Sequence, residues 1–211
     1  MEKKYPIDFE QSRVLYQSDF DSNLNGWLVR EPEVDHYDYG KYHVKIELTD
    51  EECHSGTKCL KVTDRMKSWN GTIFDITKYM RDSITKYEAM VWVKVRDGED
   101  PCRVHLSLQK NSSIGDIVFP EYTLWDDISQ APPYILSKFR LPVSSTEPVK
   151  EVWENRYTPG YVTDNGWVLL RGVINIIKNH YDSVHVYIET SESKSSTQDI
   201  YVDDFILLAG V

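Results

Sequence analysis

The dominant pattern along the chain is a strict alternation of apolar and polar residues in short runs. These runs are bounded by Gly, Asn, Asp or Pro, which is typical of β-strands separated by turns. The clearest runs are Tyr42–Leu48, Ala89–Val95, Val104–Gln109, Val168–Ile174 and Val184–Glu189. Helical periodicity is confined to residues 75–82 and 149–154, each long enough for a turn or two. The pattern predicts an all-β fold, a sandwich or barrel of antiparallel strands, and we favour the β-sandwich.

Two regions depart from this rhythm. Residues 1–13 are charged and contain Pro6, so we expect a leader or linker followed by a single module over residues 14–211. Between about 110 and 165 the alternation gives way to Pro, Ser and acidic residues interleaved with aromatic residues. A structureless loop of this length is uncommon in a compact domain, and so large an aromatic surface favours association unless it is packed. We therefore expect an ordered insertion.

Composition excludes two classes of partner. The 34 acidic and 24 basic residues give a net charge of −10, and no run of Lys and Arg provides the basic stripe of a nucleic-acid binder. No stretch approaches the roughly 18 consecutive apolar residues of a membrane span. The 14 tyrosines and 6 tryptophans are rings with an apolar body and a polar edge, which suit a wet binding surface.

The N-terminus and the cysteines each leave two alternatives. Residues 1–5 lack the apolar core of a secretory signal, so the protein is either intracellular or a module cut from a longer precursor. The cysteines at positions 53, 59 and 102 are too few and too scattered for a disulfide framework or a paired-cysteine zinc site. A bridge between Cys53 and Cys59 is one alternative, and three free thiols are the other.

One strand carries candidate chemistry. In Val184–Glu189 the apolar residues face the core, and His185, Tyr187 and Glu189 share the opposite, exposed face. Sugars stack on aromatic rings while carboxylates, amides or guanidinium groups bind their hydroxyls. A ring and a carboxylate on one face therefore favour sugar binding. The alternative is a pair of ordinary solvated residues on a sandwich face.

Several segments strengthen the sugar-binding interpretation because of their order. They are Ser18–Arg30, His54–Val62, Arg65–Gly71, Asp75–Tyr79, Tyr87–Lys94, Asn165–Trp167, Tyr187–Glu189 and Ile200–Phe205. In this order they resemble family 22 carbohydrate-binding modules of bacterial xylanases, whose relatives include families 4 and 9. The resemblance covers about residues 15–208, and its specific elements are Arg-x-x-x-Trp-Asn-Gly, Tyr-x-Glu and the terminal Asp-Asp strand. The insertion departs from the family pattern.

The resemblance implies a jelly-roll sandwich with a xylan-binding cleft on one concave face. It implies a non-catalytic, monomeric module that binds β-1,4-xylan or mixed-linkage β-1,3-1,4-glucan. The parent protein would be secreted or held at the cell surface, and it would carry a tethered catalytic domain. No nucleic acid or membrane partner is expected.

The resemblance also implies the ligand-binding residues. They are Arg30, Trp69, Tyr187 and Glu189, together with Tyr157, which fits by spacing and competes with Tyr161 and Tyr134. Trp69 would stack on one pyranose ring and Tyr187 would flank the next, while Arg30 and Glu189 would fix hydroxyls. The alternatives are a core tryptophan at Trp69 and a surface ion pair between Arg30 and a nearby glutamate.

A structural calcium ion is the implied cofactor, remote from the cleft. Its ligands would be Asp21, carbonyl oxygens of the His54–Lys58 turn, and Asp203. Calcium takes six to eight oxygen ligands, usually carboxylates and carbonyls. The alternative for Asp21 is an Asx turn that opens the loop after it.

The rival to a binding module is a jelly-roll enzyme that degrades glycans. Retaining and inverting glycosidases need two carboxyl groups at a defined separation. Glu189 has no acidic partner among the motifs, so we expect no catalytic residue. For the insertion, two roles stay open: a wall of the sugar site that contributes Tyr157, or a flap that covers a sheet edge.

Overall fold

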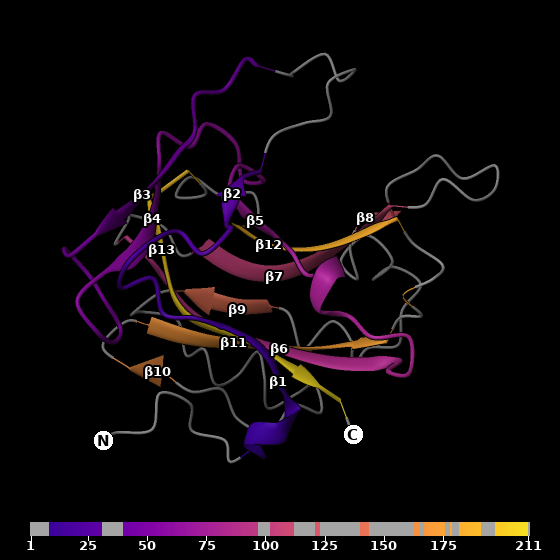
Figure 1. Ribbon diagram of the computed structural model, residues 1–211. Coiled ribbons are helices and arrows are strands. Elements are labelled where there is room, and N and C mark those ends of the chain that lie inside the picture. The colour runs from indigo at the N-terminus through magenta and orange to yellow at the C-terminus, as the bar shows by residue number, and fades with distance from the viewer. Residues whose placement is uncertain are drawn as a thin grey trace.

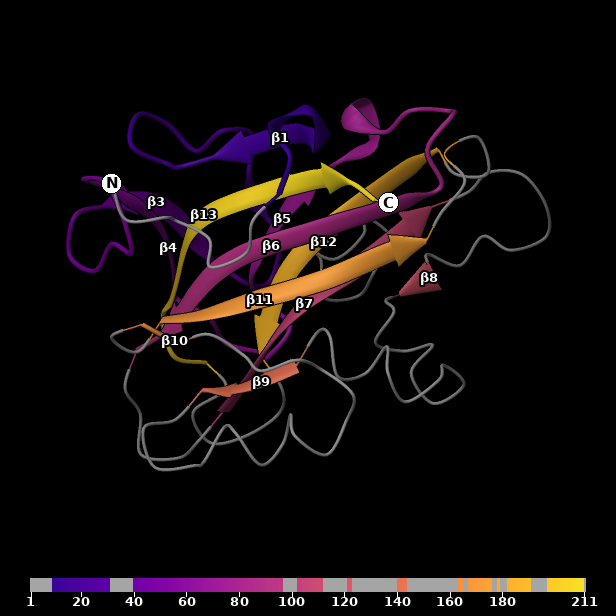
Figure 2. The same ribbon diagram turned by 90° about the horizontal axis from the view of Figure 1, so that it is seen from below.

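Two antiparallel sheets stack as the layers of a jelly-roll sandwich (Figure 1). This computed structural model describes residues 9–30, 40–96, 102–111, 121–122, 140–143, 163–164, 167–175, 178, 182–190 and 197–210. Figure 2 shows the same layers from below, with β6 and β11 in front of β12 and β7. The predicted all-β sandwich is confirmed.

The larger sheet, sheet A, has the order β10-β11-β6-β13-β4-β3, with β1 paired to β13. Its strands are β1 (Val14–Ser18), β3 (Lys45–Thr49), β4 (Cys59–Thr63), β6 (Lys86–Val95), β10 (Thr163–Asp164), β11 (Trp167–Asn175) and β13 (Ile200–Ala209). Because β13 is paired with both β6 and β4 and also with β1, it is the central strand of the fold.

The second sheet, sheet B, has the order β2-β5-β12-β7-β8, with β9 paired to β7. Its strands are β2 (Leu28–Val29), β5 (Thr72–Asp75), β7 (Cys102–Asn111), β8 (Glu121–Tyr122), β9 (Arg140–Val143) and β12 (Ser183–Thr190). Two short 3₁₀ helices complete the described elements, η1 (Gln11–Arg13) and η2 (Thr77–Tyr79). None of the helices in the described part of the chain has the length and apolar character needed to cross a membrane.

The five predicted strands are confirmed as β3, β6, β7, β11 and β12, although β3 begins three residues later than the apolar pattern does. The helical turn predicted within 75–82 is confirmed as η2, while 149–154 lies outside the described residues. Strands β8, β9 and β10 fall inside the predicted insertion and pair with β7 or β11. With two to four residues each, they are too short for alternation to reveal.

The predicted leader reaches the sandwich at its last residues. The Arg13 guanidinium donates to the Ala209 carbonyl oxygen at 2.8 Å and pairs with the Glu88 carboxylate at 3.4 Å. Phe9 packs against the apolar cluster on the outer face of sheet A. Residues 9–13 are therefore tied to β6 and β13.

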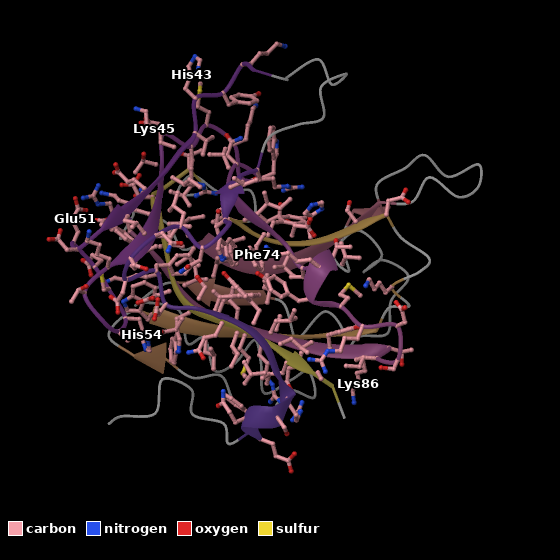
Figure 3. All side chains as sticks on the ribbon, in the orientation of Figure 1. His43, Lys45, Glu51, His54, Phe74 and Lys86 are labelled. Carbon is pink, nitrogen blue, oxygen red and sulfur yellow. The ribbon has the colours of Figure 1, made fainter. Side chains whose placement is uncertain are left out.

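The main core lies between the two sheets and follows from the alternation. Along β12, Val184, Val186 and Ile188 are buried against sheet A, as predicted. At one end of the core Phe74 stacks on Trp27 with ring centroids 5.3 Å apart, and Figure 3 shows Phe74 between the layers. Phe205 meets the edge of Trp27 at 5.2 Å, which locks β13 to this aromatic group.

Sheet A is buried on its outer face as well. Met90 and Trp92 alternate with the core residues of β6, and they join a second apolar cluster that also contains Trp167, Tyr201 and Leu208. All but the last residue of β13 is buried, because both of its faces are covered. On the outer face of sheet B, Leu28 of β2 is 64% exposed.

The loop between β4 and β5 is organised by a buried arginine. Arg65 is 5% exposed, and its guanidinium donates to the carbonyl oxygens of Ser68, Asn70 and Gln198 at 2.6 to 2.9 Å. It also donates to Thr190 Oγ1 at 2.8 Å at the end of β12. Each buried carbonyl needs a donor, so this one side chain satisfies the turn that presents Trp69.

The rest of the Arg-x-x-x-Trp-Asn-Gly motif closes the same loop. Asn70 Oδ1 accepts the backbone N–H groups of Met66 and Lys67 at 3.0 and 2.8 Å. Gly71 is buried beneath β12, where a Cβ atom would collide with the Ile188 carbonyl oxygen. The motif therefore specifies the loop that carries the tryptophan, with arginine, asparagine and glycine in structural roles.

We expect Arg65→Met to lower the free energy of unfolding by roughly 2–4 kcal/mol, because it leaves buried carbonyl groups without donors. The matched control is Arg96→Met. Arg96 is more than half exposed and pairs with Asp199 at 3.0 Å, so its loss should cost about 1 kcal/mol or less. Urea unfolding at constant m-value measures both changes. Equal losses in the two variants would contradict the structural role of Arg65.

Candidate functional site

The outer face of sheet B is built from rows of residues that the strand register sets side by side. Leu28, Ile73 and Tyr187 form one row across β2, β5 and β12. Directly opposed residues of antiparallel strands point to the same face. The next row contains Arg30 and Gly71, joined by the bond from the Arg30 N–H to the Gly71 carbonyl oxygen at 3.0 Å, and then Glu189.

The Arg30 side chain reaches β12. At Gly71, between them, a Cβ atom would collide with the Ile188 carbonyl oxygen, so only glycine fits where β12 approaches this closely. Arg30 Nη1 contacts Glu189 Oε2 at 2.7 Å, and both side chains are about nine-tenths buried. An ion pair that is this short and this shielded is geometrically fixed, unlike the exposed pair considered as an alternative for Arg30.

Tyr187 lies beneath the same guanidinium. The Arg30 Cζ atom is 3.7 Å from the centroid of the Tyr187 ring, which is cation–π geometry. The predicted face of Tyr187 is therefore correct, but its predicted exposure is wrong, since the residue is only 1% exposed. The physical reason is the Arg30 guanidinium, which covers the ring. Tyr187 orients Arg30 rather than offering an open ring face.

Trp69 lies next to this group on the β4–β5 loop. It is half-buried and belongs to neither apolar cluster, so the alternative of a core tryptophan is wrong. Its carbonyl oxygen accepts a bond from Arg30 Nη1 at 3.2 Å. The edge of its ring meets Tyr42 at a centroid distance of 5.4 Å and an interplanar angle of 83°. Arg30 and Trp69 are thus parts of one site.

Tyr42 also lies at this candidate site, although the sequence pattern did not indicate it. The alternation placed it at the start of a predicted strand, but it precedes β3, and its contact with Trp69 depends on how two distant loops meet. Tyr157 and its competitors Tyr161 and Tyr134 lie outside the described residues. His185, also on this face, is half-buried, and its burial lowers the pKa of the imidazole.

The predicted calcium ligands lie on the other sheet. Asp203 is opposite Trp92 across the β13–β6 ladder, so it shares the outer face of sheet A. Its Oδ2 atom accepts the backbone N–H groups of His54 and Ser55, both at 3.0 Å. Asp203 is fully buried, and burial together with the neighbouring Asp204 raises the pKa of its carboxyl to about 7.

Asp204 binds the same turn. The ladder is irregular between Asp203 and Ile206, and Asp204 has a left-handed backbone with φ of 47°. Its carboxylate contacts His54 Nδ1 and accepts from Ser55 Oγ, both at 2.9 Å. The His54 ring stacks on Trp92 at 4.0 Å, and Figure 3 places His54 at the side of the sandwich.

Asp21 reaches this turn from the other side. Its Oδ1 atom accepts the backbone N–H groups of Thr57 and Lys58, the latter at 3.1 Å. A Cβ atom at Gly56 would collide with this carboxylate, and Gly56 also has φ of +65°. In the loop after β1, the Asx-type hydrogen bonds to the backbone are accepted by Asp19 and Asn23. The Asx turn considered as the alternative for Asp21 is therefore made by these two residues.

Comparison with known proteins identifies the family. The family described as "Carbohydrate binding domain" matches residues 12–133, which is more than half of the chain. Endo-1,4-beta-xylanase A of Thermotoga neapolitana is 27% identical over 101 residues, or 48% of this chain, and the same enzyme of Thermotoga maritima gives the same figures. The match spans 8% of the length of these relatives.

Solved structures give the fold. The CBM22-1 xylan-binding domain of Paenibacillus barcinonensis Xyn10C is 20% identical with a TM-score of 0.60, covering 94% of this chain and 96% of that domain. The C-terminal family 22 module of Clostridium thermocellum Xyn10B is 16% identical with a TM-score of 0.62, covering 96% and 98%.

The matched family consists of binding modules rather than enzymes, which confirms the prediction of a non-catalytic module. The resemblance found in the order of the motifs is confirmed as well. The chain belongs to the carbohydrate-binding domain family and has the sandwich fold of the family 22 xylan-binding modules.

Proposed function

We propose that the outer face of sheet B binds plant cell-wall polysaccharide, with β-1,4-xylan as the first ligand and mixed-linkage β-glucan as the second. The observation that carries the proposal is the Arg30 guanidinium, held between Tyr187 and Glu189 beside the half-buried Trp69. It combines an aromatic platform with fixed polar groups, which is what sugar recognition needs. The names of the relatives, which are xylanases or xylan-binding domains, support xylan.

Trp69 supplies the stacking surface. A pyranose ring has an apolar face of C–H groups, and stacking on an indole removes that face from water. The edge contact from Tyr42 restricts rotation of the indole, so less conformational entropy is lost on binding. Tyr157 stays a predicted further ring of the site.

Arg30 and Glu189 bind hydroxyl groups. A guanidinium has five N–H donors, and the bonds to Glu189 and Trp69 both use Nη1. The donors on Nε and Nη2 are the ones we assign to the sugar. Glu189 holds Arg30 through Oε2, and its carboxylate is the proposed acceptor of a sugar hydroxyl proton.

The module's biological role would be to hold a catalytic domain on its substrate. The chain matches only 8% of the length of the xylanase relatives, which supports a module of a longer, secreted or cell-surface protein that degrades xylan. A tether raises the local substrate concentration for the linked domain without any new contact. We propose a monomeric binding module. The boundary between a linker over residues 1–13 and a module over residues 14–211 stays a prediction, and the contacts of Phe9 and Arg13 favour a module that begins before residue 14.

We also propose a structural calcium ion held by Asp21 and Asp203. The charge fits, because two carboxylates meet one turn and Asp203 is buried beside a second acid. Among the described residues no group of three or more His, Cys, Asp and Glu side chains could hold a metal. The remaining ligands would therefore be carbonyl oxygens of the His54–Lys58 turn. The ion would supply positive charge on sheet A, away from the sugar face.

Trp69→Ala should weaken xylan binding by roughly 1–3 kcal/mol, by analogy with bases stacked on aromatic platforms, and leave the fold intact. Met66→Ala is the matched control, because Met66 is an apolar residue of the same loop and is 62% exposed. Affinity gel electrophoresis against a panel of soluble xylans and glucans gives affinity and ligand class together. Unchanged migration of a folded Trp69→Ala protein would remove this residue from the site.

Glu189→Gln should lower the affinity because it weakens both the Arg30 pair and a hydroxyl bond. Arg30→Ala should then cost at least about 0.5 kcal/mol less in the Glu189→Gln protein than in the wild type, since neighbours in contact are not additive. Calorimetry with a xylo-oligosaccharide measures this cycle. Additive losses of binding free energy would show that Arg30 and Glu189 act independently. Release of reducing sugars by the wild type, but not by Glu189→Gln, would show that the protein is an enzyme rather than a binding module.

Calcium added to chelator-treated protein should raise the melting temperature, because a ligand that binds only the folded state stabilises it. The gain is about 2.7 kcal/mol at about 100 times the Kd. Asp21→Asn should abolish the response, whereas Asp19→Asn, in the same loop, should retain it. Xylan affinity should stay constant. A melting temperature that calcium does not change would contradict a structural ion. Chelation that abolishes sugar binding in a folded protein would contradict an ion remote from the sugar site.

A further inference from the structure

Two cysteines come together at the end of the β3–β4 hairpin. The ladder of this hairpin ends at the pair Thr49 and Cys59, and the connecting loop carries Cys53. The Cys59 thiol donates to the Glu52 carbonyl oxygen at 3.0 Å, next to Cys53 in the chain. The Cys53 thiol donates to the Thr49 carbonyl oxygen at 3.4 Å, next to the hairpin partner of Cys59.

The two side chains also share one apolar environment. Cys53 packs against the apolar cluster that contains Cys59, and its Sγ atom lies 3.4 Å from the carbonyl oxygen of Thr49, the residue opposite Cys59 in the ladder. A disulfide would bring the two sulfur atoms to about 2.05 Å. The carbonyl bonds that would be lost are weak, because a thiol is a poor donor.

We propose that Cys53 and Cys59 are a disulfide site, closed under oxidising conditions across the end of the β3–β4 hairpin. The oxidant we name is a small-molecule disulfide, oxidised glutathione. Cys53 is half-exposed and Cys59 is fully buried, so Cys53 reacts first.

The disulfide forms in two thiol–disulfide exchange steps. The Cys53 thiolate attacks one glutathione sulfur, which releases a glutathione thiolate and leaves a mixed disulfide on Cys53. The Cys59 thiolate then attacks the Cys53 sulfur and releases the second glutathione. The two cysteine protons pass to the two glutathione thiolates, and the two electrons reduce the glutathione disulfide.

The bridge would close a loop that the fold uses. Between the two cysteines lies the turn of His54 to Lys58, whose N–H groups bind the carboxylates of Asp21 and Asp203. Restricting this loop in the unfolded chain stabilises the folded state. The disulfide would thus fasten the polar cluster on the outer face of sheet A. It acts on stability and does not depend on the proposed sugar site.

The test equilibrates the full chain in glutathione buffers of increasing oxidising strength, then alkylates it in denaturant. We expect the oxidised protein to lose the mass of two hydrogen atoms and to carry one alkyl group, on Cys102. Peptide mapping should find residues 53 and 59 in one linked fragment. The melting temperature should rise by roughly 4–8 °C on oxidation and fall again with dithiothreitol.

Two variants keep the assignment specific. Cys102→Ala should still lose two hydrogen atoms, and Cys53→Ser should lose none and show no melting shift with dithiothreitol. Three alkylated cysteines in the most oxidising buffer would overturn the proposal. A stable glutathione adduct on Cys53, or a bridge that includes Cys102, would overturn it as well. The mass readout is made on denatured protein, so a variant that folds poorly still reports its bonding.

Discussion

The proposed binding face depends on one buried guanidinium, that of Arg65. A loop that turns sharply above β12 exposes carbonyl groups to the interior, and such groups are costly without donors. Arg65 donates to two of these carbonyls, to the Gln198 carbonyl before β13 and to Thr190 on β12, which fixes the loop to the strand that carries Tyr187 and Glu189. Trp69, on that loop, is therefore held beside these residues by backbone bonds rather than by its own packing.

The outer faces of the two sheets carry different groups of polar residues. Sheet A is covered on both faces, and its outer face holds the acids that bind the His54–Lys58 turn. The outer face of sheet B carries Arg30 with its partners Tyr187 and Glu189. Changes at the turn should act on stability, and changes at Arg30 should act on ligand affinity. The fold separates the two effects because its core lies between them.

Alternation predicted the strands and the face of Tyr187, because a period of two is a local property of the chain. It could not predict that Arg30 covers Tyr187. That contact depends on the register of β2 against β5 and of β5 against β12. The motif around Trp69 was found because it resembles that of family 22 carbohydrate-binding modules. The structural roles of Arg65 and Asn70 could be assigned only from their hydrogen bonds. Tyr42 was missed for the same reason: its contact joins distant loops.

The central claim, that carbohydrate meets Trp69 and Arg30 on sheet B, is tested most directly by titrating a xylo-oligosaccharide into isotopically labelled protein and following its NMR spectrum. The account predicts progressive shifts of the Trp69 indole N–H and the Arg30 Nε–H signals, while the indole signal of Trp92 on sheet A stays in place. Shifts confined to sheet A, or a spectrum unchanged by saturating ligand, would contradict it.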